Sequence, residues 1–409
     1  MKRTLSLITL IALCLVCASA CAESGNSLGL QLLAALWDGK SNCFVSPLCL
    51  ETALAMTAGG AAGETREELL SAIGAEQDAP VLPSVSDQFK SANAVFVRPS
   101  LALKPSYEAD IKESYGAEIF PLDDPARVNE WVRRRTNGQI DSLLSESQPP
   151  EADMLLLSAL AFEAKWALPF DEKDTYNGRF QAPDGGVSVR TMYRKIEDAN
   201  YAEIEDIQLL GLRYKGSKAY MLLALPMDGD IKRALAWLAR TDVNSIRFRQ
   251  ESADRIVQDI IDSEKAKGRT VSKTDEAVIR WKYPGPMPWK VVLRLPKFDL
   301  CVENELKAPL EAQGVGAMFD RERADFSGMS DTPLYVDSVL QKLRVQVDEQ
   351  STRAAAVMEE SFAALSVPPT TQFEQVWIKF TCDRPFIVLI VDGASGEIGF
   401  AGVVADPRG

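Results

Sequence analysis

The first third of the chain carries its hydrophobic residues at spacings of three and four, the period of an amphipathic helix. Side chains at that spacing share one helix face, which can then pack on a core. Four stretches show the pattern: residues 27–38, 48–74, 105–116 and the stretch that follows Asp123. The N-terminal part of the molecule is therefore predicted to be mainly helical.

Later segments are short apolar or alternating runs rich in Val, Leu and Ile, which are typical of strands. Because strands dominate the later part and helices the earlier part, we expect an α+β protein with large, mixed or mostly antiparallel sheets. No linker or fixed-period repeat divides the chain, so residues 23–409 are expected to form one domain. The predicted strands are residues 91–97, 154–166, 218–226, 289–298, 339–347, 376–380 and 385–392.

One segment, VDEQSTRAAAVMEESFAALSVPP at residues 347–369, fits neither pattern. Residues 352–364 alternate as a strand would, but most of their side chains are small, and Pro368 and Pro369 follow. Small side chains can enter between two existing strands without overpacking them. The segment is therefore interpreted as a strand held outside its sheet, with a plain surface loop as the alternative.

The N-terminus predicts a secretory signal over residues 1–22. Lys2 and Arg3 precede an apolar run that ends near Ala18, and small residues follow. The run is too short to span a bilayer stably. Two processing routes stay open: cleavage after Ala22, or cleavage before Cys21 as in a lipoprotein. We expect an exported protein, either freely secreted or anchored at the cell surface by a lipid on Cys21.

Composition and charge exclude several function classes. The chain is 46% hydrophobic and 25% charged, as in soluble proteins, and its formal charge of −13 argues against a nucleic-acid partner. It contains no histidine, so Ser-His-Asp and Cys-His hydrolases and HExxH zinc sites cannot be built. No catalytic, metal or cofactor site is identified, and the protein is not expected to be an enzyme. The run 133–135, three arginines, is interpreted as a solvated helix face.

The cysteines do not form a recognisable site. Seven are present, and Cys14 and Cys17 leave with the predicted signal on either processing route. The others lack the close spacing of a metal or redox site, so they are interpreted as small buried apolar residues whose disulfide state stays open. They are Cys21, Cys43, Cys49, Cys301 and Cys382.

Five motifs in order resemble those of the serpin family, including its secreted bacterial members, over nearly the whole mature chain. Four of them are NCFVSPLCLETALAMTAGGAAGETREEL, WVRRRTNGQI, LLLSALAFEAKWALPF and LKAPLEAQGVGAMFDRERADFSGM. The fifth, FTCDRPFIVLI, fits the family's C-terminal signature at every position. The resemblance implies the serpin fold: a large central mixed sheet, further sheets, mainly N-terminal helices and an exposed reactive-centre loop, in a monomer.

The resemblance also implies how residues 349–369 act as that loop. A serine protease of chymotrypsin-like, elastase-like or subtilisin-like specificity would cleave the bond Leu365-Ser366 and become trapped as a covalent acyl complex. The cleaved loop would then insert into the central sheet. The implied hinge and insertion residues are Glu349, Ser351, Thr352, Ala354, Ala355 and Ala356.

Some positions depart from the family pattern. Ser351 stands where glycine is usual, and Glu360 would face the core on insertion. Residues 244–288 are longer than their usual counterpart, as in an insertion, and are assigned no function. A non-inhibitory protein of the same fold, acting as carrier, chaperone or substrate, is the alternative. The polar cluster that controls opening of the sheet maps onto Ser46, Cys49, Ser158 and Gln341.

Overall fold

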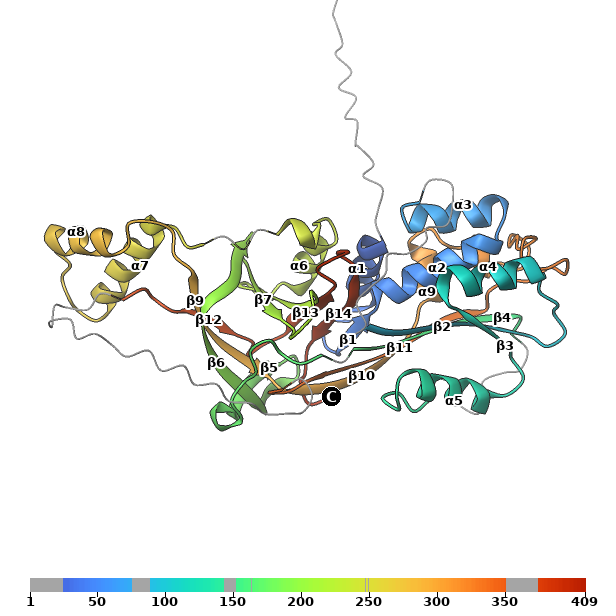
Figure 1. Ribbon diagram of the computed structural model, residues 1–409, viewed down its shortest axis with the longest axis horizontal. Helices are drawn as coiled ribbons and strands as arrows, with labels where there is room; N and C mark the ends of the chain where they lie inside the picture. The colour runs from blue at the N-terminus through green and yellow to red at the C-terminus, as the bar shows by residue number, and fades with distance from the viewer. Residues whose placement is uncertain are drawn as a thin grey trace, which may run out of the picture.

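The part of the chain that the structure describes is elongated and forms two sheets, with most of its helices gathered over one end (Figure 1). The computed structural model describes residues 25–75, 89–142, 152–162, 164–246, 248, 250–350 and 374–409. Residues 1–24 lie outside that part, so the signal remains a sequence prediction. No helix among the described residues is both long enough and apolar enough to cross a bilayer.

The first sheet has five strands and is mixed, as predicted for the central sheet. The strand β11 pairs in parallel with β4 at its centre and antiparallel with β10, and β2 pairs antiparallel with β4 and in parallel with β3. In order across the sheet, the strands are β10 (Phe298–Glu305), β11 (Ser338–Val347), β4 (Met154–Phe162), β2 (Phe89–Val97) and β3 (Glu118–Pro121).

The second sheet has nine strands and holds the most buried part of the chain. Every residue of β13 and β14 is buried, which explains their continuous apolar sequences. In order, its strands are β1 (Cys43–Val45), β14 (Ile398–Val404), β13 (Phe386–Val391), β8 (Tyr220–Pro226), β7 (Ile207–Arg213), β6 (Gly185–Ile204), β9 (Trp289–Pro296) and β12 (Ile378–Thr381), with β5 (Tyr176–Ala182) paired to β6.

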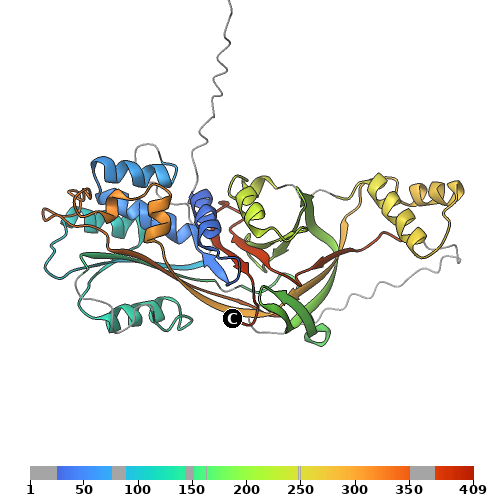
Figure 2. The ribbon, with the colours of Figure 1, turned by 180° about the vertical axis from the view of Figure 1, so that it is seen from behind.

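The helices cover the five-stranded sheet unequally. In Figures 1 and 2, α2, α3, α4 and α9 lie over one face and α5 over the other, while α7 and α8 lie at the opposite end of the molecule. The helices are α1 (Gly25–Leu36), α2 (Pro47–Gly60), α3 (Gly63–Ala72), α4 (Pro105–Tyr115), α5 (Pro125–Arg135), α6 (Ile231–Leu238), α7 (Ala253–Ala266), α8 (Lys273–Lys282) and α9 (Lys307–Ala312).

Several element boundaries differ from the sequence predictions, three of them as follows. The periodic stretch 48–74 forms two helices, because Ala61 and Ala62 adopt extended backbone between α2 and α3. The helix α5 ends at Arg135, and the left-handed backbone at Asn137 and Gly138 turns the chain away. The strand predicted to reach residue 166 ends at Phe162.

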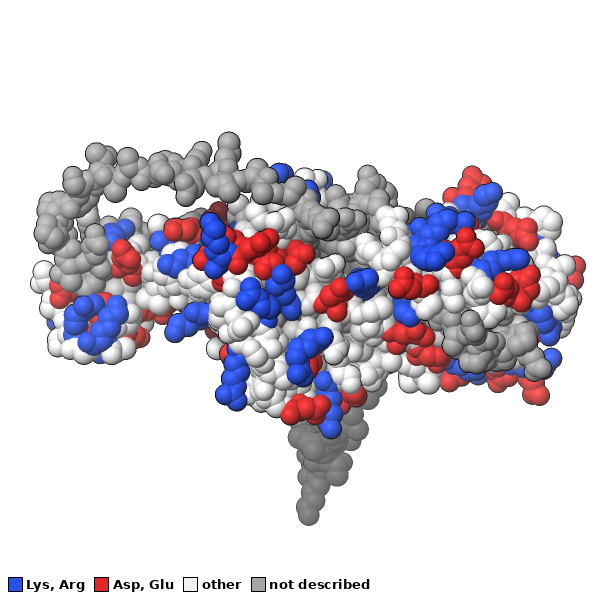
Figure 3. Space-filling model, turned by 90° about the horizontal axis from the view of Figure 1, so that it is seen from below, with Lys and Arg blue, Asp and Glu red and all other residues white. Residues whose placement is uncertain are grey.

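Charged side chains of both signs are interspersed over the face of the molecule in Figure 3. The three arginines of the run 133–135 are exposed, as predicted for a solvated helix face. Cys43, Cys49 and Cys382 are buried, as predicted, and all three are free. Cys301 is free but exposed, because its side chain points away from the core on β10, so its interpretation as a buried residue was wrong.

Candidate functional site

The centre of the five-stranded sheet is a seam between two parallel strands, β4 and β11. Their register runs from Leu155 opposite Ser338 to Ala161 opposite Arg344. Beyond β11 the described chain continues only to Gln350 and resumes at residue 374. The segment interpreted as a withheld strand therefore follows directly from one edge of this seam.

A row of polar side chains crosses the seam. Asn93 on β2 is the register partner of Ser158 on β4, which pairs with Gln341 on β11, which pairs with Asn304 on β10. Direct partners in neighbouring strands lie on the same face of a sheet. All four are buried, so each needs hydrogen-bond partners inside the protein.

These partners come largely from the start of α2. Ser46 caps this helix by accepting a hydrogen bond from the Cys49 backbone N–H at 3.1 Å, and Pro47 occupies the first helical position. The Gln341 side chain accepts a bond from the Ser46 N–H at 2.8 Å and donates one to the Ser46 carbonyl at 3.1 Å. The centre of the sheet is thereby fixed to the capped end of α2.

The other members of the row complete this attachment. Ser158 Oγ donates to Asn93 Oδ1 at 2.8 Å and lies 3.5 Å from the Cys49 carbonyl oxygen. Asn304 Nδ2 donates to the Phe44 carbonyl at 2.5 Å. Because Ser158 and Gln341 stand on opposite sides of the seam, separating β4 from β11 must disturb contacts on at least one side.

The structure thus brings the four predicted cluster residues together and adds two that sequence reasoning missed. Asn93 carried a signal, because this polar residue shares one face of the predicted strand 91–97 with Val95 and Val97. Asn304 carried none, because its strand was not predicted as a separate element. Cys49 contributes its backbone N–H and its carbonyl to these contacts. Burial raises the pKa of its thiol to about 12, so the thiol stays protonated.

Glu349 lies just beyond the end of β11, where its side chain and backbone are bonded to other elements. Its carboxylate accepts hydrogen bonds from Thr175 Oγ1 at 2.8 Å and from Lys297 Nζ at 2.6 Å. Burial alone would raise the pKa of Glu349, but these donors outweigh it and lower the pKa below its usual value. Phe170 N–H donates to the Glu349 carbonyl at 2.9 Å. Several elements therefore hold the point from which the predicted loop departs.

The described chain resumes on the other side of the loop in a buried setting. The backbone N–H of Gln375 donates to Tyr283 Oη at 2.8 Å, and its side-chain Nε2 donates to the Pro288 carbonyl at 2.9 Å and to Glu251 Oε2. Burial raises the pKa of Glu251. Both flanks of the predicted loop are thus fixed to the body of the protein.

The remaining predicted site residues lie outside the described residues, and their roles stay predictions. They are Ser351, Thr352, Ala354, Ala355, Ala356, Leu365 and Ser366. Within the described ranges, no group of three or more Cys, Asp or Glu side chains is placed to hold a metal ion.

Comparison with known proteins identifies the family. The family model for serpins, serine protease inhibitors, matches residues 23–258 and 268–407, so the chain belongs to the serpin family. The family is one of serine protease inhibitors rather than of proteases. Iripin-2 of Ixodes ricinus is 29% identical over 99% of this chain and 98% of its own. Plasminogen activator inhibitor 1 of Bos taurus is 28% identical over 90% of this chain and 87% of its own.

A solved structure supports the fold. The thermophilic serpin tengpin in its native state superposes with a TM-score of 0.71, at 25% sequence identity, over 94% of each chain. The prediction of a serpin fold with a large mixed sheet is therefore confirmed.

The Glu349 contacts predict a pH-dependent contribution to stability. Folding lowers the pKa of Glu349, so its carboxylate stabilises the folded protein at pH values above the pKa of the unfolded state, near 4.3. This stabilisation is lost as the pH falls through the pKa of the folded state. We expect Glu349→Gln to lower the melting temperature at pH 7, reflecting a loss of about 2 kcal/mol. Melting curves recorded from pH 7 to pH 3 should show the wild type and the variant converging.

The matched control is Glu172→Gln. Glu172 is exposed and accepts a single bond from Gln350 at 3.3 Å. Its replacement should leave the melting temperature within about 1 °C of wild type at every pH, since exposed polar contacts contribute little. A Glu349→Gln difference that persists at pH 3 would show that the carboxylate charge is not what stabilises this corner.

Proposed function

We propose that the protein is an irreversible, covalent inhibitor of serine endopeptidases with chymotrypsin-like, elastase-like or subtilisin-like specificity. The observation that carries the proposal is the seam itself. The strands β4 and β11 are direct neighbours and parallel, and the segment of small residues follows from the end of β11. A chain that returned from there would run antiparallel to both strands, an arrangement that would let it pair with each of them.

In this mechanism the protease serine attacks the carbonyl carbon of Leu365. The peptide bond to Ser366 breaks, Ser366 leaves with a new amino terminus, and Leu365 becomes the acyl group of an ester on the protease. The part after Ser366 stays attached through Gln375 and its bonds. The part before it is free to enter the seam.

Insertion moves the protease across the inhibitor. About thirteen residues at 3.3 Å each correspond to roughly 40 Å of strand, and the acylated protease travels with the strand's end. Distortion of the protease's oxyanion site would remove the stabilisation that hydrolysis of the ester needs. The acyl-enzyme then persists as a covalent complex.

Opening the seam sets the barrier to this movement. Insertion must separate Ser158 from Gln341 and pass the corner held by Glu349, Thr175 and Lys297. These contacts stabilise the intact form and slow insertion before cleavage. Ser351 restricts the backbone more than glycine would, so this chain is expected to insert more slowly than a serpin with glycine there.

The proposal predicts an adduct that resists SDS. Incubation with chymotrypsin or pancreatic elastase should give a band at the summed mass of inhibitor and protease, together with a released peptide that begins at Ser366. Gel electrophoresis and mass spectrometry provide the two measurements. Complete cleavage without adduct would favour the non-inhibitory alternative, and a peptide with another first residue would shift the reactive bond.

Leu365→Arg is the matched specificity variant. An arginine at the reactive position should redirect inhibition to trypsin, whose primary pocket holds a buried carboxylate. The rate with chymotrypsin should fall in parallel. No gain against trypsin would contradict the assignment of Leu365.

A further inference from the structure

The helices α7 and α8 form a hairpin that projects from the far end of the molecule (Figure 1). The hairpin has a small core of its own, formed by buried residues from both helices and the residue that follows them. A two-way backbone pairing of Glu251 with Met287 closes its base, at 2.8 and 3.0 Å. The core residues are Ile256, Val257, Ile260, Ile279 and Tyr283.

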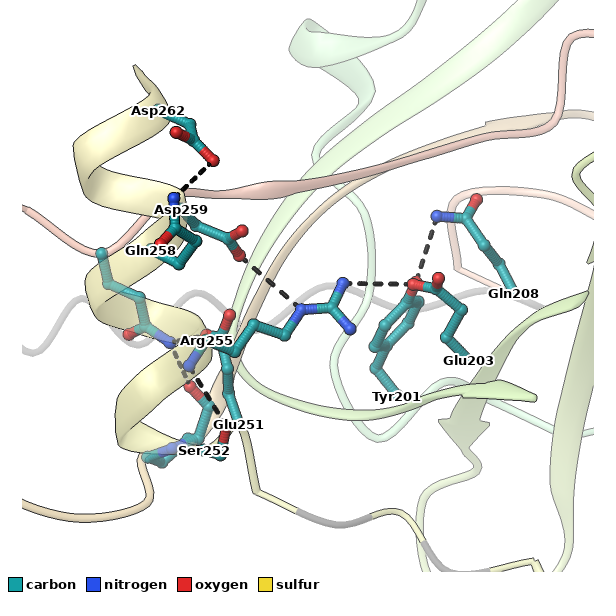
Figure 4. Close-up of polar contacts among 11 residues, drawn as sticks. Tyr201, Glu203, Gln208, Glu251, Ser252, Arg255, Gln258, Asp259 and Asp262 are labelled. Atoms are coloured by element: carbon teal, nitrogen blue, oxygen red, sulfur yellow. Dashed lines mark hydrogen bonds and ion pairs between the residues drawn. The ribbon is translucent and has the colours of Figure 1, made fainter. Parts of the chain in front are cut away.

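Arg255 at the start of α7 fixes the hairpin to the nine-stranded sheet. Its guanidinium lies 3.2 Å from a carboxylate oxygen of Glu203 on β6 (Figure 4). The same group lies 5.0 Å from the ring centre of Trp289. Asp259, one turn further along α7, faces the same guanidinium at 3.7 Å. The hairpin is therefore held in a defined position relative to β6 and β9.

The outer face of α8 carries unusually exposed apolar residues. Trp281 is 84% exposed and Val278 is 47% exposed. They are three positions apart and so lie on one helix face, with Ala277 beside them. Ile279 and Tyr283 supply the hairpin core from the other face, so the fold does not need Trp281 for its own packing. An exposed tryptophan next to other exposed apolar residues is typical of binding surfaces.

This hairpin departs from the common family pattern. The family model matches the chain on both sides but leaves residues 259–267 unmatched, and these form the second half of α7 and its end. The unmatched part is thus the second half of α7 and its end, whereas α8, with Val278 and Trp281, lies inside the matched residues 268–407.

The hairpin binds the chain a short distance after the predicted reactive bond. Gln375 is bound by Tyr283, at the end of α8, and by Glu251 at the base of the hairpin. Nine residue steps separate Ser366 from Gln375, so the bond lies at most about 32 Å along an extended chain from this anchor. A protease domain of about 230 residues has a radius of gyration near 17 Å, and hence a diameter of about 45 Å.

We propose that the face of α8 formed by Ala277, Val278 and Trp281 is a docking surface for the target protease. It would contact an apolar patch on the protease while the reactive bond occupies the active site. This inference rests on the proposed inhibitory function and adds a second contact that selects among proteases with similar primary pockets. The surface acts before acylation, on the encounter, and takes no part in loop insertion.

The test compares Trp281→Ala with wild type against chymotrypsin, pancreatic elastase and subtilisin. We expect the second-order rate constant of inhibition to fall at least tenfold with one or more of them. The number of inhibitor molecules needed per protease and the melting temperature should stay unchanged, because an exposed side chain contributes little to insertion or packing. The control is Met227→Ala, which removes an apolar side chain that is 52% exposed in the turn after β8.

The outcomes separate this proposal from the inhibitory function. If wild type forms no SDS-resistant adduct with any of the three proteases, the inhibitory function fails and the docking surface fails with it. If wild type forms adducts and Trp281→Ala keeps the wild-type rate with all three, only the docking surface is overturned. Sedimentation and binding to phosphatidylserine vesicles would then show whether Trp281 serves a second copy of the chain or a lipid surface.

Discussion

Cleavage within residues 352–366 is expected to raise the melting temperature by about 10 °C or more. Insertion would replace one parallel ladder, between β4 and β11, by two antiparallel ladders. A net gain of about a dozen hydrogen bonds at ~1 kcal/mol each gives a driving force on the order of 10 kcal/mol. With an unfolding entropy of about 0.8 kcal/mol/K for a chain of this length, that corresponds to about 12 °C.

Thermolysin is the suitable protease for this measurement. It activates water on zinc and forms no acyl-enzyme, so it should cut the segment without being trapped. Melting curves before and after limited proteolysis give the shift, and mass spectrometry locates the cut. Equal melting temperatures would mean that the cleaved segment does not enter the sheet, which would remove the inhibitory mechanism. If the intact form is less stable than the cleaved form, the intact form is kinetically trapped. The contacts of Glu349 and Gln341 would then supply the barrier to insertion.

Thr352→Arg is expected to convert the inhibitor into a substrate. Thr352 would be the first residue to pass between β4 and β11, with its side chain directed to the interior. An unpaired guanidinium there costs several kcal/mol, far more than the ~1 kcal/mol from each early hydrogen bond. Insertion would stall, and the acyl-enzyme would hydrolyse. The ratio of inhibitor to protease needed for full inhibition should rise about tenfold or more, with cleavage still at Leu365-Ser366.

Arg353→Glu is the matched control for this prediction. The next residue along a strand points to the opposite face, so a charge there should stay in solvent and leave inhibition nearly unchanged. Thr352→Arg should also abolish the rise in melting temperature after thermolysin cleavage. A wild-type ratio for Thr352→Arg would show that the loop does not insert in this register.

Two separate groups of contacts, the polar row and the Glu349 corner, hold the seam closed. Gln341 and Ser158 hold the two central strands to one helix end in the interior, while Glu349 holds the point where the loop begins. A protease that has cut the loop does not act directly on the polar row or on the Glu349 corner. In the proposed mechanism the inserting strand would displace the corner first and the row second, so substitutions at the corner should alter the start of insertion and substitutions in the row its progress.

Local patterns in the sequence predicted much of the fold but missed its long strand. The helical period and the apolar runs located α1, α2, α4, β8 and β13 because both signals depend only on neighbouring residues. The strand β6 carries polar residues along most of its length and shows no comparable run, although it pairs with β5, β7 and β9. Its pairing partners, distant in sequence, stabilise it.

The ordered motifs of the sequence by themselves identified the family. The resemblance to that family then implied the candidate reactive bond, which stays a prediction, and four members of the polar cluster. Only the tertiary structure decided that Asn93 and Asn304 join that cluster, that Lys297 and Thr175 hold Glu349, and that the chain after the loop is anchored on the α7–α8 hairpin. Each of these contacts joins residues on different elements. Which residues meet depends on strand order and register across a whole sheet, and no local pattern records that order.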